Sequence, residues 1–105
     1  MQANGVMMIP KSVNVLGREY TIGMEETMPN MLGYCDYENL SIKIKADQQP
    51  DMELDTVLHE ILHAIDYSMN TELEERQIYC MTVGILSVLK YNQPLLEYLY
   101  KAIKK

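Results

Sequence analysis

Two histidines and a glutamate in the stretch VLHEILHAIDY, residues 57–67, have the types and spacing needed to bind a metal ion. His59 and His63 are the only histidines in the chain, and Glu60 directly follows the first of them. On a helix, side chains at i and i+4 lie one above the other, so both imidazoles can reach one tetrahedral zinc ion at about 2.0–2.1 Å. The glutamate then lies beside the ion and can take a proton from a bound water. This HExxH pattern predicts a hydrolytic zinc centre with Glu60 as the catalytic base.

A catalytic zinc site needs a third protein ligand, and with no further histidine it must come from a carboxylate. Thr71 and Glu74 fit the Ser/Thr-x-x-Glu capping box, which would occupy Glu74 at a helix start. Glu75 instead lies one turn before Ile78 on an apolar face, so it should point toward a neighbouring helix. We therefore expect His59, His63 and Glu75 to hold the zinc ion. Glu74 and Asp66 stay open as alternatives, and Asp66 could also orient an imidazole.

The helix that carries the histidines is predicted to begin after Pro50, with Asp51 as its N-cap, and to end near Met69. At 100° per residue, His59, His63 and Asp66 fall on one arc, with Glu60 at its flank. The opposite arc is apolar and should face the core. It contains Leu54, Val57, Leu58, Ile61, Leu62, Ile65 and Met69.

Residues 11–45 have the alternating pattern of β-strands. Two runs, 12–16 and 19–24, are separated by Gly17, and two more flank the turn-forming residues 36–39. This predicts a small antiparallel sheet of three to four strands. The last strand, Leu40 to Lys45, alternates apolar and polar residues and is the expected exposed edge for pairing with an extended peptide.

After the HExxH helix the pattern predicts a glutamate helix and a C-terminal helix, so the fold class is α+β. The run IYCMTVGILSVLKY, residues 78–91, is apolar nearly all round and should be buried on several sides. The final helix should turn four apolar residues inward, namely Leu95, Leu96, Leu99 and Ile103. At 105 residues the chain is expected to form a single domain, 1–105, with residues 1–8 as a flexible extension.

Composition narrows the classes of partner. The net charge of -6 argues against general nucleic-acid binding, which depends on clustered Lys and Arg. No apolar run is long enough to cross a membrane, and the N-terminus lacks the pattern of a secretory signal. We therefore expect a cytoplasmic protein, monomeric or weakly oligomeric, that contacts neither nucleic acid nor membrane.

Four stretches together resemble a known family. The chain is similar to the small HExxH proteins of bacteriophages and prophages, which are related in outline to the ImmA/IrrE-type zinc peptidases and to the minimal gluzincins. The similarity begins near Met7 or Met8. It lies in IPKSVNVLGREY, LGYCDYENLSIKI, TVLHEILHAIDY and EERQIYCMTVGILSVLKYNQPLLEYL.

The resemblance implies a zincin-like fold and a Zn²⁺-dependent metallopeptidase that hydrolyses a peptide bond in a host or phage protein. It also implies that the third zinc ligand is a glutamate on the next long helix, which matches the placement of Glu75. With no third histidine, stabilisation of the oxyanion would fall to the zinc ion alone or to a tyrosine such as Tyr34, Tyr37 or Tyr79. The alternative is a non-catalytic zinc-binding protein that binds or inhibits a host factor.

Overall fold

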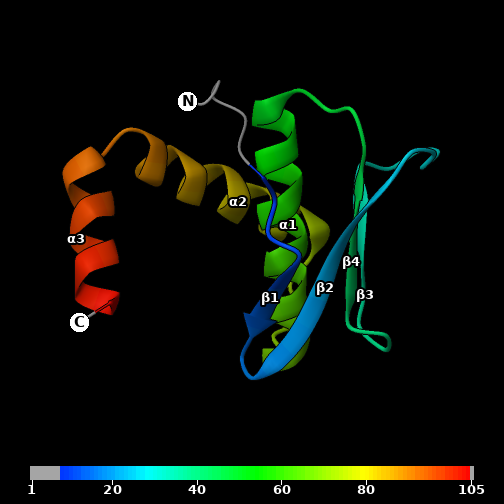
Figure 1. Cartoon of the computed structure of the whole chain (residues 1–105). Helices are drawn as coiled ribbons and strands as arrows, with labels where there is room; N and C mark the ends of the chain where they lie inside the picture. The colour runs from blue at the N-terminus through cyan, green and yellow to red at the C-terminus, as the bar shows by residue number, and fades with distance from the viewer. Residues whose placement is uncertain (1–7, 105) are drawn as a thin grey trace. The chain divides into compact units, whose positions relative to one another are not determined.

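The computed structural model describes residues 8–104, so most of the expected extension, residues 1–7, lies outside the described residues. The elements are β1 (Ser12–Val15), β2 (Arg18–Glu25), β3 (Gly33–Asp36), β4 (Ser41–Lys45), α1 (Pro50–Met69), α2 (Glu75–Lys90) and α3 (Gln93–Ile103). An α+β fold with four strands before three helices is confirmed (Figure 1). The chain divides into two compact units, residues 1–72 and 73–105. None of the three helices in the described part has both the length and the apolar character of a membrane span.

The sheet is mixed, so the expectation of a purely antiparallel sheet is wrong. Its strand order is β1-β2-β4-β3, and β2 pairs with β4 in parallel while the other two pairings are antiparallel. β4 therefore lies inside the sheet with neighbours on both sides. The expectation that residues 40–45 form a free edge is wrong too, and the edge strands are β1 and β3.

Two local turns fix the hairpins. Leu16 and Gly17 connect β1 to β2 and both have positive φ, 52° and 89°, which is the backbone of a two-residue type I′ turn. At the second hairpin, the Asp36 carboxylate accepts hydrogen bonds from the backbone N–H groups of Glu38 and Asn39, each at 3.2 Å. Hydrogen bonding by Asn39 is the main cause that lowers the pKa of Asp36. These contacts form within a few residues of sequence, which is why the turns could be predicted.

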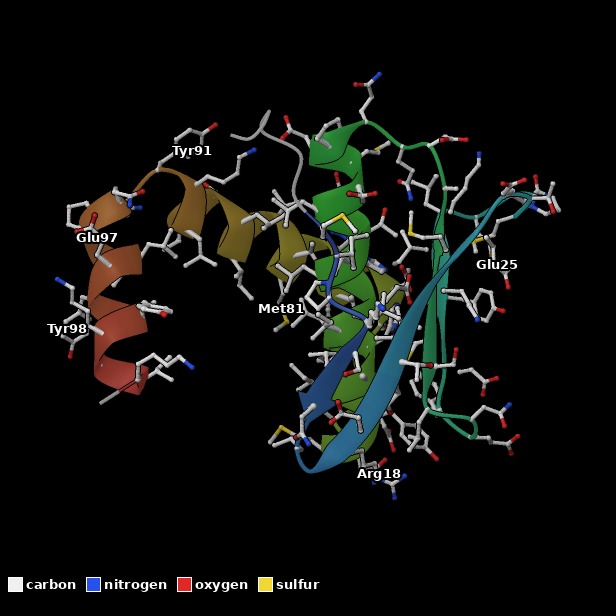
Figure 2. All side chains as sticks on the ribbon, viewed as in Figure 1. Arg18, Glu25, Met81, Tyr91, Glu97 and Tyr98 are labelled. Atoms are coloured by element: carbon white, nitrogen blue, oxygen red, sulfur yellow. The ribbon has the colours of Figure 1, made fainter. Side chains whose placement is uncertain are left out.

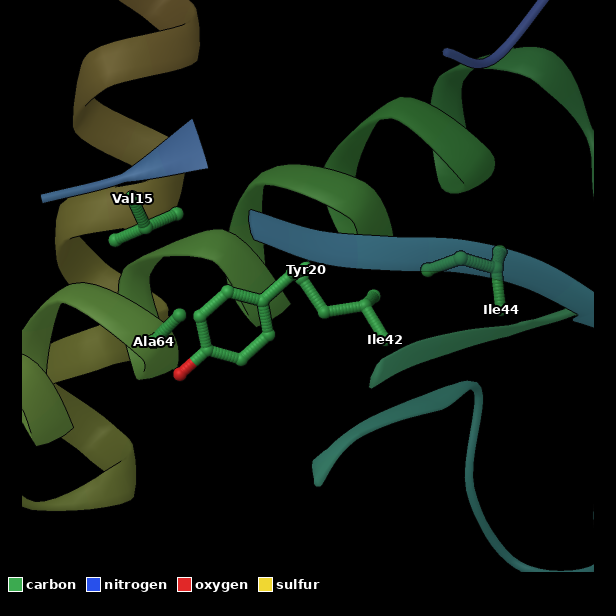
Figure 3. Close-up of a cluster of buried hydrophobic side chains, with 5 residues drawn as sticks. All are labelled: Val15, Tyr20, Ile42, Ile44 and Ala64. Atoms are coloured by element: carbon green, nitrogen blue, oxygen red, sulfur yellow. The ribbon is translucent and has the colours of Figure 1, made fainter. Parts of the chain in front are cut away.

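The core of the first unit lies between the sheet and α1, which runs along one face of the strands (Figure 1). Figure 3 shows the buried cluster formed by Val15, Tyr20, Ile42, Ile44 and Ala64. On β4 the two isoleucines are buried and alternate with the half-buried Lys43, so the predicted alternation appears, with the polar side less exposed than expected. This packing anchors α1 and so positions its histidines.

α1 begins at Pro50, with Gln49 rather than the expected Asp51 as its N-cap. Proline fits the first helical position because its missing N–H would have no partner there. The end at Met69 is confirmed, and Asn70 closes the helix in the left-handed conformation with φ 53°. At the two ends of the predicted apolar arc, Leu54 and Met69 are 45% and 59% exposed, so the arc is less buried there than expected.

Gly33 allows β3 to approach α1 closely. A Cβ at this position would lie 2.8 Å from Cγ2 of Thr56 and 2.9 Å from the backbone oxygen of Lys43. We expect Gly33→Ala to lower the free energy of unfolding by about 1–3 kcal/mol, because strand and helix must separate. Gly84→Ala in α2, where a Cβ meets nothing within 4 Å, is the control and should be neutral or stabilising. Urea unfolding of both variants measures the difference; equal stabilities would contradict the steric argument.

In the second unit, α2 and α3 bury less than their sequence predicts. On α2 only Ile78 and Thr82 are buried, and no residue of α3 is. The expectation of a helix buried on several sides is therefore wrong, and so is the expected inward position of Ile103, which is 77% exposed. The apolar side chains instead line an open groove between α2 and α3 of about 510 Å³, which includes Met81, Ile85, Val88, Leu95 and Leu99.

Candidate metal centre

The two histidines lie on one stripe of α1 and turn their Nε2 atoms toward each other. These two nitrogens are 3.2 Å apart, and the rings meet at 66°. Two ligands of a tetrahedral zinc ion, each about 2.05 Å from the metal, would be about 3.3 Å apart. The spacing of His59 and His63 thus already matches one edge of a zinc tetrahedron.

Glu75, the expected third ligand, is the first residue of α2. One ring nitrogen of each histidine and one Glu75 carboxylate oxygen lie within 4.8 Å of one another. Across residues 8–104, His59, His63 and Glu75 are the one group of three metal-ligating side chains gathered in this way. The structure therefore brings together the three residues that the sequence singled out, as a possible metal-binding triad.

Glu74 has a different role, and the predicted capping box is displaced by three residues. Glu74, not Thr71, is the N-cap of α2, and its backbone N–H donates to Oε1 of Gln77 at 2.8 Å. Thr71 is held at the end of α1, where its N–H donates to the backbone oxygen of Asp66 at 3.2 Å. Glu72 has a left-handed backbone conformation, with φ 57°, which does not fit the first turn of a right-handed α-helix. A helix therefore cannot start at Thr71.

Asp66 lies one turn beyond His63 on the same stripe of α1. Its carboxylate accepts a hydrogen bond from the Thr71 hydroxyl. This contact joins the last turn of α1 to the segment that follows it. Asp66 is not among the three grouped ligands.

Glu60 is buried against β3, with only 6% of its surface exposed. A Cβ added to Gly33 would lie 3.4 Å from its Cγ, so the glutamate packs under the start of that strand. It is thus more buried than the flank of a polar arc would be. The reason is that Thr56, Glu60 and Ala64 form an i, i+4, i+8 stripe whose members are all buried.

The pKa values of two residues in or next to β3 are raised, mainly by burial and further by nearby negative charge. Burial raises the pKa of the Cys35 thiol to about 12, and the Glu60 carboxylate adds to the effect. Burial also raises the pKa of Tyr37 to about 12, followed by charge interactions with Cys35, Asp66 and Glu60. Both groups are therefore neutral near pH 7, and Tyr37 keeps the hydroxyl hydrogen that a donor needs.

The contact between Tyr37 and α1 could not be predicted from the sequence. Tyr37 stacks on Tyr67 of α1, with ring centroids 4.2 Å apart and an interplanar angle of 3°. These residues are 30 positions apart, and only the placement of β3 along α1 joins them. The one sequence feature related to this contact is that Tyr37 lies in the turn just before β4, the strand that leads into α1.

Comparisons of this chain with protein-family models, with curated proteins and with solved structures give no match, so the interpretation of the centre depends on its own geometry.

Proposed function

We propose that this protein is a minimal zincin-like metallopeptidase that uses Zn²⁺ to hydrolyse a peptide bond in a host or phage protein. The observation that carries the proposal is the 3.2 Å separation of the two Nε2 atoms, with a Glu75 oxygen grouped beside them. Two imidazoles and one carboxylate form a donor set of catalytic zinc sites, whereas structural zinc sites usually have four protein ligands rich in cysteine. The order of sheet, HExxH helix and glutamate helix supports the same proposal.

The residues present fit zinc, and each has a distinct part. His59, His63 and Glu75 would hold the ion, which when bound supplies a positive charge that polarises the scissile carbonyl and acidifies water. Glu60 follows His59 directly and is held under β3, so its carboxylate has a fixed position. It would take a proton from the attacking water and return it to the leaving amine. Its low exposure limits competing contacts with bulk solvent.

The free edge of β3 would hold the substrate backbone. Lys45 donates its N–H to the Leu32 oxygen at 2.8 Å, which makes this pair a hydrogen-bonded one. Hydrogen-bonded pairs alternate along antiparallel strands, so the backbone N–H and C=O of Tyr34 also point toward β4. The backbone N–H and C=O groups of Gly33 and Cys35 then point away from β4, toward the free edge of the sheet. An extended peptide could add to this edge as a further strand and would lie next to Glu60. β3 thus replaces β4 as the proposed docking strand.

The activity is tested with a peptide library prepared from a bacterial proteome. We expect the zinc-loaded protein to produce new peptide termini, a chelator to stop this, and added zinc to restore it. Mass spectrometry of the termini is the measurement. A purified protein without stoichiometric zinc, or cleavage that continues in the chelator, would contradict the proposal.

The third ligand is tested by three carboxamide variants. We expect Glu75→Gln to weaken zinc binding by more than about a hundredfold, since losing even an outer-shell partner costs about ten- to a hundredfold. Glu74→Gln and Asp66→Asn are the matched controls and should keep their zinc, because one caps α2 and the other binds Thr71. Competition with a zinc-binding dye measures each affinity. Zinc loss in a control rather than in Glu75→Gln would reassign the ligand.

A second candidate function is a non-catalytic zinc protein that binds or inhibits a host factor. The burial of Glu60, at 6% exposed, is the observation in its favour, because a catalytic base must reach a water molecule. In that case zinc would stabilise the fold, and Glu60→Gln would leave partner binding unchanged. Stoichiometric zinc without any new termini in the peptide library would favour this function.

A further inference from the structure

A second cavity lies beside the last turns of α1, and all the residues that line it belong to the first unit. Its volume is about 610 Å³, which falls within the range of about 300–1,000 Å³ that ligand pockets occupy. The lining includes Arg18, Tyr37, Asp66, Tyr67, Ser68 and Glu72. Neither zinc ligand of α1 is among the lining residues, so this is a separate site.

The cavity continues the stripe of α1 that carries the histidines. Asp66 and Asn70, which both line it, follow His63 by three and seven residues. At about 1.5 Å per residue these positions are about 4.5 and 10 Å further along the helix. An extended peptide advances about 3.3 Å per residue. A side chain about one to three residues from a bond held at His63 would therefore reach the cavity.

One wall of the cavity is aromatic. Tyr37 and Tyr67 stack with parallel rings, so each covers one face of the other. Tyr67 remains 53% exposed, which leaves much of its surface available. The negative face of an aromatic ring attracts Lys and Arg side chains. The same wall would also contact their aliphatic stems.

The charges of the lining favour a cation. Asp66 and Glu72 each bring a carboxylate, against the single guanidinium of Arg18. Figure 2 shows Arg18 extending from the start of β2 away from the ribbon. Residues 1–72 hold 12 acidic and 4 basic residues, a net charge of -8. The negative charge near Tyr37, which contributes to its raised pKa, includes Asp66 and Glu60.

We infer that this cavity binds a basic side chain, Lys or Arg, of the peptide whose backbone lies along β3. The aromatic wall and the carboxylates of Asp66 and Glu72 form the binding groups. The inference rests on the proposed function for the role of the peptide, but the binding of a basic group can be measured without hydrolysis.

The test uses three small probes that differ only in the side chain: the Nα-acetyl amides of lysine, norleucine and glutamate. They are titrated into zinc-loaded protein, and the amide NMR signals of Tyr67 and Ser68 report binding. We expect the lysine probe to bind up to about fivefold more tightly than norleucine, the upper end for an exposed ion pair. Glu72→Gln should reduce this preference. Glu26→Gln is the control, because Glu26 is exposed and outside the lining.

The outcomes separate this inference from the proposed function. Equal binding of the three probes, absence of binding by any of them, or tighter binding of glutamate through Arg18 would overturn it. So would an unchanged preference in Glu72→Gln. If the protein binds the lysine probe but neither holds zinc nor cleaves the peptide library, the proposed peptidase function is contradicted. The inferred site for basic ligands would then stand on its own.

Discussion

Replacing Glu60 by Gln is expected to lower peptide hydrolysis by about 10²- to 10⁴-fold, the usual contribution of a general base, and to leave one zinc ion bound. Gln is almost the same size and can occupy the same buried position under Gly33. It cannot accept a proton from water. The measurement is the rate of new-terminus formation in the peptide library, together with the zinc content of the purified variant.

Glu53→Gln is the matched control, since Glu53 is in the first turn of the same helix. Its activity and zinc content should equal those of the native protein. A Glu60→Gln protein that remains folded and fully active would remove Glu60 from the mechanism. A variant that loses zinc would show that this carboxylate holds the metal instead.

His63→Ala is expected to abolish stoichiometric zinc binding and with it the effect of zinc on thermal stability. Anything that binds only the folded state stabilises it, by about 4 kcal/mol when the free ligand is a thousandfold above its dissociation constant. The native protein should therefore unfold at a higher temperature with zinc than with a chelator. The variant should unfold at the same temperature in both. Differential scanning calorimetry measures both proteins.

The double variant His59→Ala, His63→Ala provides the check on a shared ion. If both rings hold one zinc, removing the second ring after the first should cost no further zinc-dependent stability, because the effects are not additive. Each ring also packs on α1, so the chelated proteins give the baseline for lost packing. Independent, additive losses of zinc-dependent stability would mean that the two imidazoles do not share a metal.

The pairing of His59 with His63 could be predicted because it depends on one helix. An i, i+4 spacing fixes which side chains meet once the helix forms, and α1 forms over nearly the predicted residues. The expected Glu75 cluster also appears, although for a partly wrong reason. Thr71 does not cap α2, and Glu74 and Gln77 do so instead.

The parallel pairing of β2 with β4 could not be predicted from alternation. Period-two patterns show which side of a strand is buried but not which strands are neighbours. Both β2 and β4 carry such patterns, and either hairpin alone satisfies them. The burial of Glu60 was hidden for a related reason: its neighbour Gly33 belongs to a strand whose position depends on the whole sheet.

The strand order has a consequence for how the chain folds during synthesis. β4 is the last strand to be made, yet it must enter between β2 and β3. Until residue 45 has left the ribosome, β2 can pair only with β1, and its other backbone edge, residues 21–25, stays open to unwanted strand partners. The sheet is therefore complete only when the β1–β2 and β3–β4 hairpins pair through β2 and β4, whose paired residues are 20 positions apart, and α1 is the next segment to emerge.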